Sequence, residues 1–121
     1  SFWYKLKNLI LLTKNSYINE SKIITVKLDD YFTSKNISSI DLLKIDTEGY
    51  ELNVLKGSEK VLDKHIKYIL IEIKFIHFFH NYNVGNIENY LESKKFNLVK
   101  KFTHPLRHYE DRLYLNQTKY I

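Results

Sequence analysis

The sequence predicts an α/β fold, because apolar strand-like segments alternate with segments of helical spacing along most of the chain. Segments 40–46 and 66–75 are rich in Ile and Leu and have the character of buried strands. A helical pattern lies between them, and two shorter apolar segments follow around a turn at Pro105. This order is typical of α/β domains. Two strands joined through a helix are expected to be parallel, with a right-handed crossover.

We expect the elements in a definite order after a poorly defined lead-in segment, residues 1–22. Asp29 and Asp30 are expected to cap the first helix and Ser58 a later one, since Asp and Ser favour helix N-termini. The expected elements are a strand at 23–28, a helix at 29–34, a strand at 40–46, helices at 50–56 and 58–64, a strand at 66–75, an aromatic loop at 77–85, a helix at 86–95 and paired strands at 96–103 and 111–116.

The composition excludes several classes of protein. The 121 residues suffice for one domain, and 44 % hydrophobic with 15 % aromatic residues exclude intrinsic disorder as the main state. No apolar run approaches the ~18 residues of a membrane-spanning helix. Cysteine is absent, which excludes disulfides, thiolate metal ligands and a cysteine nucleophile.

The net charge of +5 comes almost entirely from scattered lysines. Only Arg107 and Arg112 are arginines, whereas proteins that read bases rely on arginine forks, so a nucleic-acid partner is not expected. The default expectation for location is the cytoplasm, and the sequence does not indicate an oligomeric state. Because the chain begins with Ser1 and lacks methionine, we expect a processed chain, an engineered chain or a fragment.

Acidic residues follow the first of the two buried strands. Asp46 ends that strand, Gly49 allows a tight turn into the helix, and Glu48 and Glu51 are expected in the first helical turn. Ligands of parallel sheets bind beyond the carboxyl ends of the strands, so Asp46 and Glu48 are candidate site residues. For Glu51 we expect a surface charge that complements the helix dipole.

The second strand carries a further candidate carboxylate and leads to two histidines. Glu72 is flanked by isoleucines, where a carboxylate requires a partner or a cleft. His77 and His80 follow this strand, so they lie on the same side of the sheet as the acidic turn. Their HxxH spacing alone is a weak indication of a metal site.

Three segments resemble the FkbM-type family of S-adenosylmethionine-dependent methyltransferases. They are VKLDDYF at 26–32, IDLLKIDTEGYELNVLKGSEKVL at 40–62 and IKYILIEIKF at 66–75, and the later NIENYLESKKFNLV and DRLYLN also fit. The resemblance spans about residues 23–116 and implies a partial Rossmann-like class I methyltransferase sheet that lacks its first strands. In that sheet 40–46 is the fourth strand, 66–73 the fifth, and the last two strands form an antiparallel hairpin.

The resemblance also implies an activity and site residues. Family members generally transfer methyl groups to hydroxyls of sugars, polyketides or related metabolites, so the expected acceptor is a small molecule or a glycan. Asp46 and Glu48 would bind S-adenosylmethionine, while Asp46, Glu72 and His77 would be catalytic. A base or orienting group beside the acceptor is expected to be Asp46, or otherwise His77. A divalent ion between Asp46 and Glu72 is conceivable, but no metal site is predicted.

The resemblance covers only the C-terminal part of the family's domain, here residues 23–121. Family members carry a glycine-rich cofactor loop before this part, and residues 1–22 contain no counterpart to it. We therefore expect this chain by itself to bind the cofactor weakly or not at all and to be inactive.

Two other readings remain open. Asp46 followed by Glu72 and Lys74 fits the D…ExK pattern of metal-dependent nucleases, whose carboxylates usually lie on an antiparallel hairpin. Parallel or antiparallel pairing of 40–46 with 66–75 therefore discriminates between the two enzymes. Alternatively, the chain is a non-catalytic remnant that acts as an interaction module through its aromatic loop at 75–83 and its basic surface.

Overall fold

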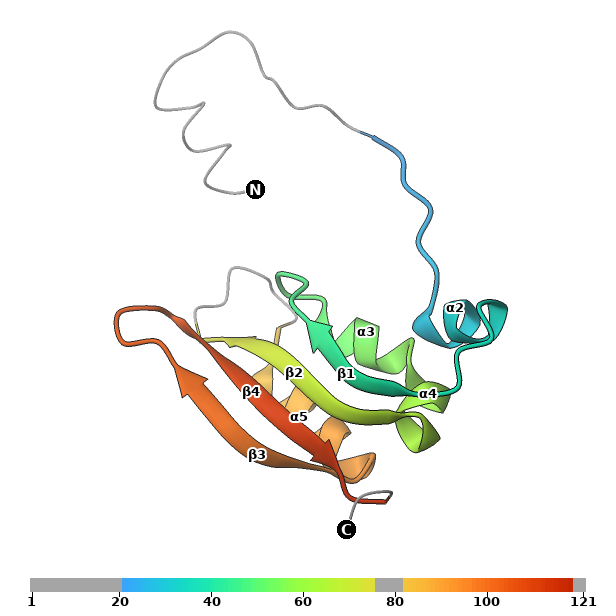
Figure 1. Cartoon of the computed structure of the whole chain (residues 1–121). Helices are drawn as coiled ribbons and strands as arrows, with labels where there is room; N and C mark the ends of the chain where they lie inside the picture. Colours follow the sequence, from blue (N-terminus) through green and yellow to red (C-terminus); the bar gives the residue numbers. More distant parts are fainter. Residues whose placement is uncertain (1–20, 76–81, 119–121) are drawn as a thin grey trace, which may run out of the picture.

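The computed structural model describes residues 21–75 and 82–118, which form a four-stranded sheet and four helices (Figure 1). The strands are β1 (Ile40–Ile45), β2 (Ile66–Lys74), β3 (Phe96–Thr103) and β4 (Tyr109–Asn116). The helices are α2 (Leu28–Ser34), α3 (Glu51–Lys56), α4 (Glu59–Lys64) and α5 (Val84–Ser93).

The order of the strands confirms the predicted α/β class. The sheet has the order β1-β2-β4-β3. Strands β1 and β2 are parallel, with Ile45 opposite Ile71, and helices α3 and α4 lie between them along the chain. The last two strands form the expected antiparallel hairpin, and β4 also pairs antiparallel with β2. The carboxyl ends of β1 and β2 therefore meet at one end of the sheet.

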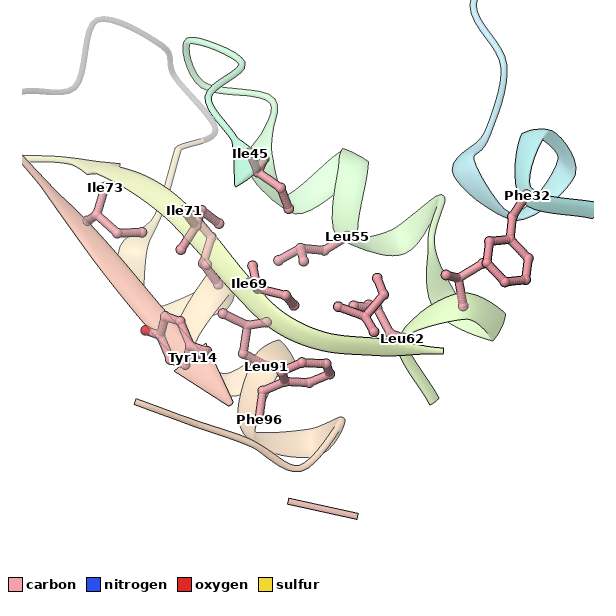
Figure 2. Packing of buried hydrophobic residues seen from close by; sticks show 13 residues of the cluster. Phe32, Ile45, Leu55, Leu62, Ile69, Ile71, Ile73, Leu91, Phe96 and Tyr114 are labelled. Carbon is pink, nitrogen blue, oxygen red and sulfur yellow. The ribbon is translucent and has the colours of Figure 1, made fainter. Parts of the chain in front are cut away.

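The hydrophobic core lies between one face of the sheet and the helices. Burial alternates along β2, so Ile69, Ile71 and Ile73 are fully buried against the helices. Figure 2 shows them packed with Leu55 of α3 and Leu91 of α5. Burial of such a side chain stabilises the fold by about 1.5–3 kcal/mol.

The intervening side chains of the sheet point to the opposite face. Leu42, Tyr68 and Leu115 are opposite one another in register on this face, and Leu42 is 52 % exposed. Glu72 and Lys74 follow Tyr68 at the same alternation, so they belong to this second face. The candidate carboxylate of β2 thus points away from the hydrophobic core.

The prediction of a strand at 23–28 is wrong. Residues 21–27 form no helix or strand, and Ile24 is 96 % exposed. A β-branched segment becomes a strand only beside a partner, and none of the described strands pairs with this one. The helix that follows begins at Leu28, one position before the expected start.

The predicted helix caps are also wrong, because the capping side chain comes from another helix. Neither α2 nor α4 has a side-chain cap of its own. The Asp29 carboxylate of α2 instead accepts hydrogen bonds from the backbone N–H groups of Lys60 (3.1 Å) and Val61 (3.0 Å) at the start of α4. The Ser58 hydroxyl donates to the Val54 carbonyl oxygen at 2.6 Å. Asp29 therefore joins α2 to α4.

The C-terminal part agrees with the predicted elements apart from three boundaries, namely both ends of α5, which stops at Ser93 rather than at 95, and the start of β4. Helix α5 begins at Val84 rather than at 86, because the Asn83 side chain accepts a hydrogen bond from the Asn86 N–H and caps the helix. Strand β4 begins at Tyr109, since its pairing with Lys74 of β2 extends β4 toward the turn. None of the helices in the described ranges is long and apolar enough to cross a membrane.

Candidate functional site

A tight turn at residues 46–49 connects the end of β1 to α3. Glu48 and Gly49 both adopt positive φ angles, 56° and 109°. Glycine takes such a conformation without steric cost, whereas a residue with a Cβ does so rarely. The turn therefore has an unusual backbone path, which presents the side chains of Asp46 and Glu48 beyond the strand.

The expectation that Glu51 is a surface charge is wrong, since its side chain is 0 % exposed. One carboxylate oxygen, Oε1, accepts hydrogen bonds from the backbone N–H groups of Thr47 (3.1 Å) and Gly49 (3.2 Å). Buried backbone N–H groups require an acceptor, and the turn leaves these two without a backbone partner. The sequence places Glu51 at the start of a helix but does not reveal this role, because a glutamate in the first helical turn is usually exposed.

Three carboxylates predicted as site residues are brought together at this end of the sheet. Because Ile45 and Ile71 are opposite in register, the residues that follow them, Asp46 and Glu72, are neighbours. One oxygen each of Asp46, Glu48 and Glu72 lies within 4.8 Å of the others. Asp46 and Glu48 are exposed and Glu72 is half-buried, so the group is open to a ligand.

The Lys74 side chain lies among these carboxylates. Its ammonium Nζ forms an ion pair with Glu48 and lies 3.4 Å from Oε1 of Glu72. Burial lowers the pKa of Lys74, but the hydrogen bond and charge of Glu48 outweigh it, so the pKa is raised. Lys74 therefore stays positively charged and partly neutralises the cluster.

The pKa of Glu72 is raised above its ordinary value. Burial is the largest cause, and the negative charge of Asp46 adds to it, while the charge of Lys74 opposes both. A carboxyl group with a raised pKa accepts a proton more readily than an ordinary glutamate. Glu72 is thus better suited to proton transfer near neutral pH than a fully solvated carboxylate.

Oxygen ligands at this spacing are also those that Mg²⁺ and Ca²⁺ prefer. Asp46, Glu48 and Glu72 each offer one oxygen to such an ion. The Lys74 ammonium already pairs with Glu48 and Glu72, so a divalent ion would have to displace it. The geometry fits an ion but does not point to one specifically.

Several neighbours of the cluster were not predicted. The Tyr82 hydroxyl accepts a hydrogen bond from the Lys74 backbone N–H at 3.0 Å, and burial raises the pKa of Tyr82. Asp111 of β4 is opposite Glu72 in register, and the His104 ring nitrogen Nε2 lies 3.5 Å from its carboxylate. The position of Asp111 depends on the pairing of β2 with β4, which no local sequence signal reveals. The predicted site residue His77 falls outside the residues that the structure describes, as does His80.

Comparison with protein families decides the class of this domain. The model of the methyltransferase FkbM domain matches residues 5–98. The chain belongs to the FkbM methyltransferase family. The matched part of this FkbM domain contains β1, β2 and the turn between Asp46 and Gly49, so all three clustered carboxylates lie within it. A search of curated proteins and a search of solved structures each gave no significant match.

Membership confirms the resemblance seen in the sequence. It supports a methyltransferase in general, and the carboxylates at the ends of the parallel strands are the candidate site that the described residues provide.

Proposed function

We propose that this FkbM domain transfers a methyl group from S-adenosylmethionine to a hydroxyl group of a small molecule or a glycan. The observation that carries the proposal is the cluster of Asp46, Glu48 and Glu72 at the carboxyl ends of two parallel strands, within the part that matches the family. Ligands of open α/β sheets bind at this position.

We further propose that the sheet is the second half of a Rossmann-like class I methyltransferase sheet. In this assignment β1 and β2 are the fourth and fifth strands, and the β3–β4 hairpin supplies the antiparallel pair. The support is the order β1-β2-β4-β3, in which β4 lies between the parallel pair and β3. On its outer edge β1 pairs with no other described strand, so that edge is open to a further strand.

The donor set of the cluster fits the polar groups of S-adenosylmethionine. Asp46 and Glu48 are exposed acceptors, suited to the ribose hydroxyls and the ammonium group of such a cofactor. When bound, the cofactor supplies an activated methyl group on a sulfonium centre. The chain's own residues would orient the acceptor hydroxyl and remove its proton.

We propose that Asp46 and Glu72 orient the acceptor hydroxyl and remove its proton. Asp46 lies at the end of β1, beside Glu72, and the raised pKa of Glu72 suits it to hold a proton taken from a hydroxyl. Lys74 would stabilise the ionised form of Glu72 before the transfer. His77 remains the alternative base. No metal ion is required in this scheme.

The two rival readings receive less support. The nuclease reading brings together the same Asp46, Glu72 and Lys74, but β1 and β2 are parallel and joined through helices rather than forming an antiparallel hairpin. The reading as a non-catalytic interaction module would be favoured if the domain failed to bind S-adenosylmethionine even with the upstream part of the methyltransferase fold restored. For its location we propose the cytoplasm.

The proposal is tested by assaying methyl transfer from radiolabelled S-adenosylmethionine to a panel of sugars and hydroxylated metabolites, with this domain in a methyltransferase that also carries the glycine-rich cofactor loop. Asp46→Ala should abolish transfer while the folded state persists. The matched control is Asp41→Ala, which removes an exposed carboxylate from the same strand outside the cluster. If the Asp46 variant retained the transfer rate of the unmodified protein, the assignment of Asp46 would be wrong.

A further inference from the structure

The carboxylate of Glu51 turns back from the start of α3 into the turn that precedes it. Its Oε1 accepts from the backbone N–H groups of Thr47 at 3.1 Å and Gly49 at 3.2 Å, and the Thr47 hydroxyl lies 3.4 Å away. The side chain is fully buried. Hydrogen bonds from backbone N–H groups to a carboxylate are roughly twice as strong as neutral ones.

The turn that Glu51 holds has a backbone path that needs support. Glu48 has a φ of 56°, and Gly49, which donates the second hydrogen bond, has a φ of 109°. For a residue with a Cβ such as Glu48, this conformation persists only where the surrounding structure determines it. The same turn carries Asp46 and Glu48, whose carboxylates meet Glu72 of the next strand.

We propose that Glu51 is a positioning residue: its carboxylate fixes the turn at 46–49, and thereby sets where Asp46 and Glu48 stand relative to Glu72. Glu51 is buried behind the turn, so it acts through these residues and not on a ligand. The importance of this arrangement for methyl transfer rests on the proposed function, whereas the positioning itself does not.

The geometry distinguishes the conservative substitutions. The second carboxylate oxygen, Oε2, is buried and has no hydrogen-bond partner among the described residues. All the hydrogen bonds from the turn therefore reach Oε1, so Gln, which keeps one carbonyl oxygen at the same reach, should preserve them. Asp keeps the charge but is one methylene shorter and should lose both.

The first measurement is amide hydrogen exchange of the full chain by NMR. In Glu51→Asp, the amides of Thr47 and Gly49 should exchange roughly ten- to a hundredfold faster, the loss expected for a hydrogen bond to a charged group. The core amides of Ile69 and Ile71 should be unchanged. In Glu51→Gln, which keeps the acceptor oxygen but not the charge, both turn amides should exchange faster than in the unmodified chain but more slowly than in Glu51→Asp. Unchanged protection in the Asp variant, or exchange in the Gln variant as fast as in the Asp variant, would overturn the proposal.

The second measurement reports the position of the turn. The chain has no cysteine, so Asp46→Cys combined with Glu72→Cys provides one pair, oxidised to a disulfide by molecular oxygen with a copper catalyst. Addition of Glu51→Asp should slow disulfide formation severalfold, whereas addition of Glu51→Gln should not. An unchanged rate in the Asp background would overturn the positioning role. Because neither measurement uses enzymatic activity, failure of the methyltransferase assay would leave their outcome unaffected.

Discussion

The Lys74 ammonium lies 3.4 Å from the Glu72 carboxylate and pairs at the same time with Glu48. Lys74 and Glu72 come from β2, whereas Glu48 comes from the turn after β1. One cation thus joins the ends of the two parallel strands. The positive charge of Lys74 also lowers the pKa of Glu72, whereas burial and the negative charge of Asp46 raise it.

Removal of Lys74 should raise the pKa of Glu72 further. The Lys74 charge lowers that pKa in the native protein, so in Lys74→Ala only burial and the carboxylates remain to act on it. The carboxyl carbon of Glu72 can be titrated by NMR. Lys67→Ala, at the opposite end of β2, should leave the titration unchanged. A pKa of Glu72 that stayed the same or fell in Lys74→Ala would contradict the ion pair.

The raised pKa of Glu72 should make stability depend on pH. The folded state binds the Glu72 proton more tightly than the unfolded chain, whose pKa is the ordinary value of 4.5. The free energy of unfolding should therefore fall as the pH rises from 4.5 through the folded-state pKa. In Glu72→Gln this contribution disappears, so the fall should be shallower.

Urea unfolding across this pH range measures the effect. Glu92→Gln is the matched control, since Glu92 is exposed on α5 outside the cluster. Its pH dependence should match that of the unmodified protein. If the free energy of unfolding of Glu72→Gln fell with rising pH as steeply as that of the unmodified protein, Glu72 would not titrate as proposed.

The cap that Asp29 provides to α4 predicts a stability effect far from the site. Asp29→Ala leaves the N–H groups of Lys60 and Val61 without their acceptor, so it should destabilise the fold by about 0.5–2 kcal/mol. Asp30→Ala, which alters an exposed neighbour, should have a much smaller effect. Denaturant unfolding distinguishes them. Equal stabilities of the two variants would contradict the capping role.

Much of the fold could be predicted because local pattern and packing agree. Burial alternates along β2, whose isoleucines are all buried, and the turn around Pro105 joins the hairpin as expected. The strand at 23–28 could not be predicted correctly, because a β-branched segment indicates a strand whether or not a partner is present. The caps were missed since Asp29 acts on a helix about thirty residues away.

The site was predicted only in its outline. The rule that ligands bind beyond the carboxyl ends of parallel strands leads to Asp46, Glu48 and Glu72, and the structure brings these together. Burial of Glu51 could not be predicted, since it depends on the turn's backbone N–H groups. The proximity of Asp111 depends on antiparallel pairing between strands distant in sequence.

The most direct test of the account is to map where a methyltransferase cofactor contacts this domain. S-adenosylhomocysteine, the stable demethylated form, would be titrated into the ¹⁵N-labelled chain while backbone amide signals are followed by NMR. We predict weak binding, with shift changes concentrated at residues 46–49 and 72–74 and reduced in Asp46→Ala but not in Asp41→Ala. Shift changes confined to α2 or to the β3–β4 hairpin, or the same changes in Asp46→Ala, would contradict a cofactor site at the carboxyl ends of β1 and β2.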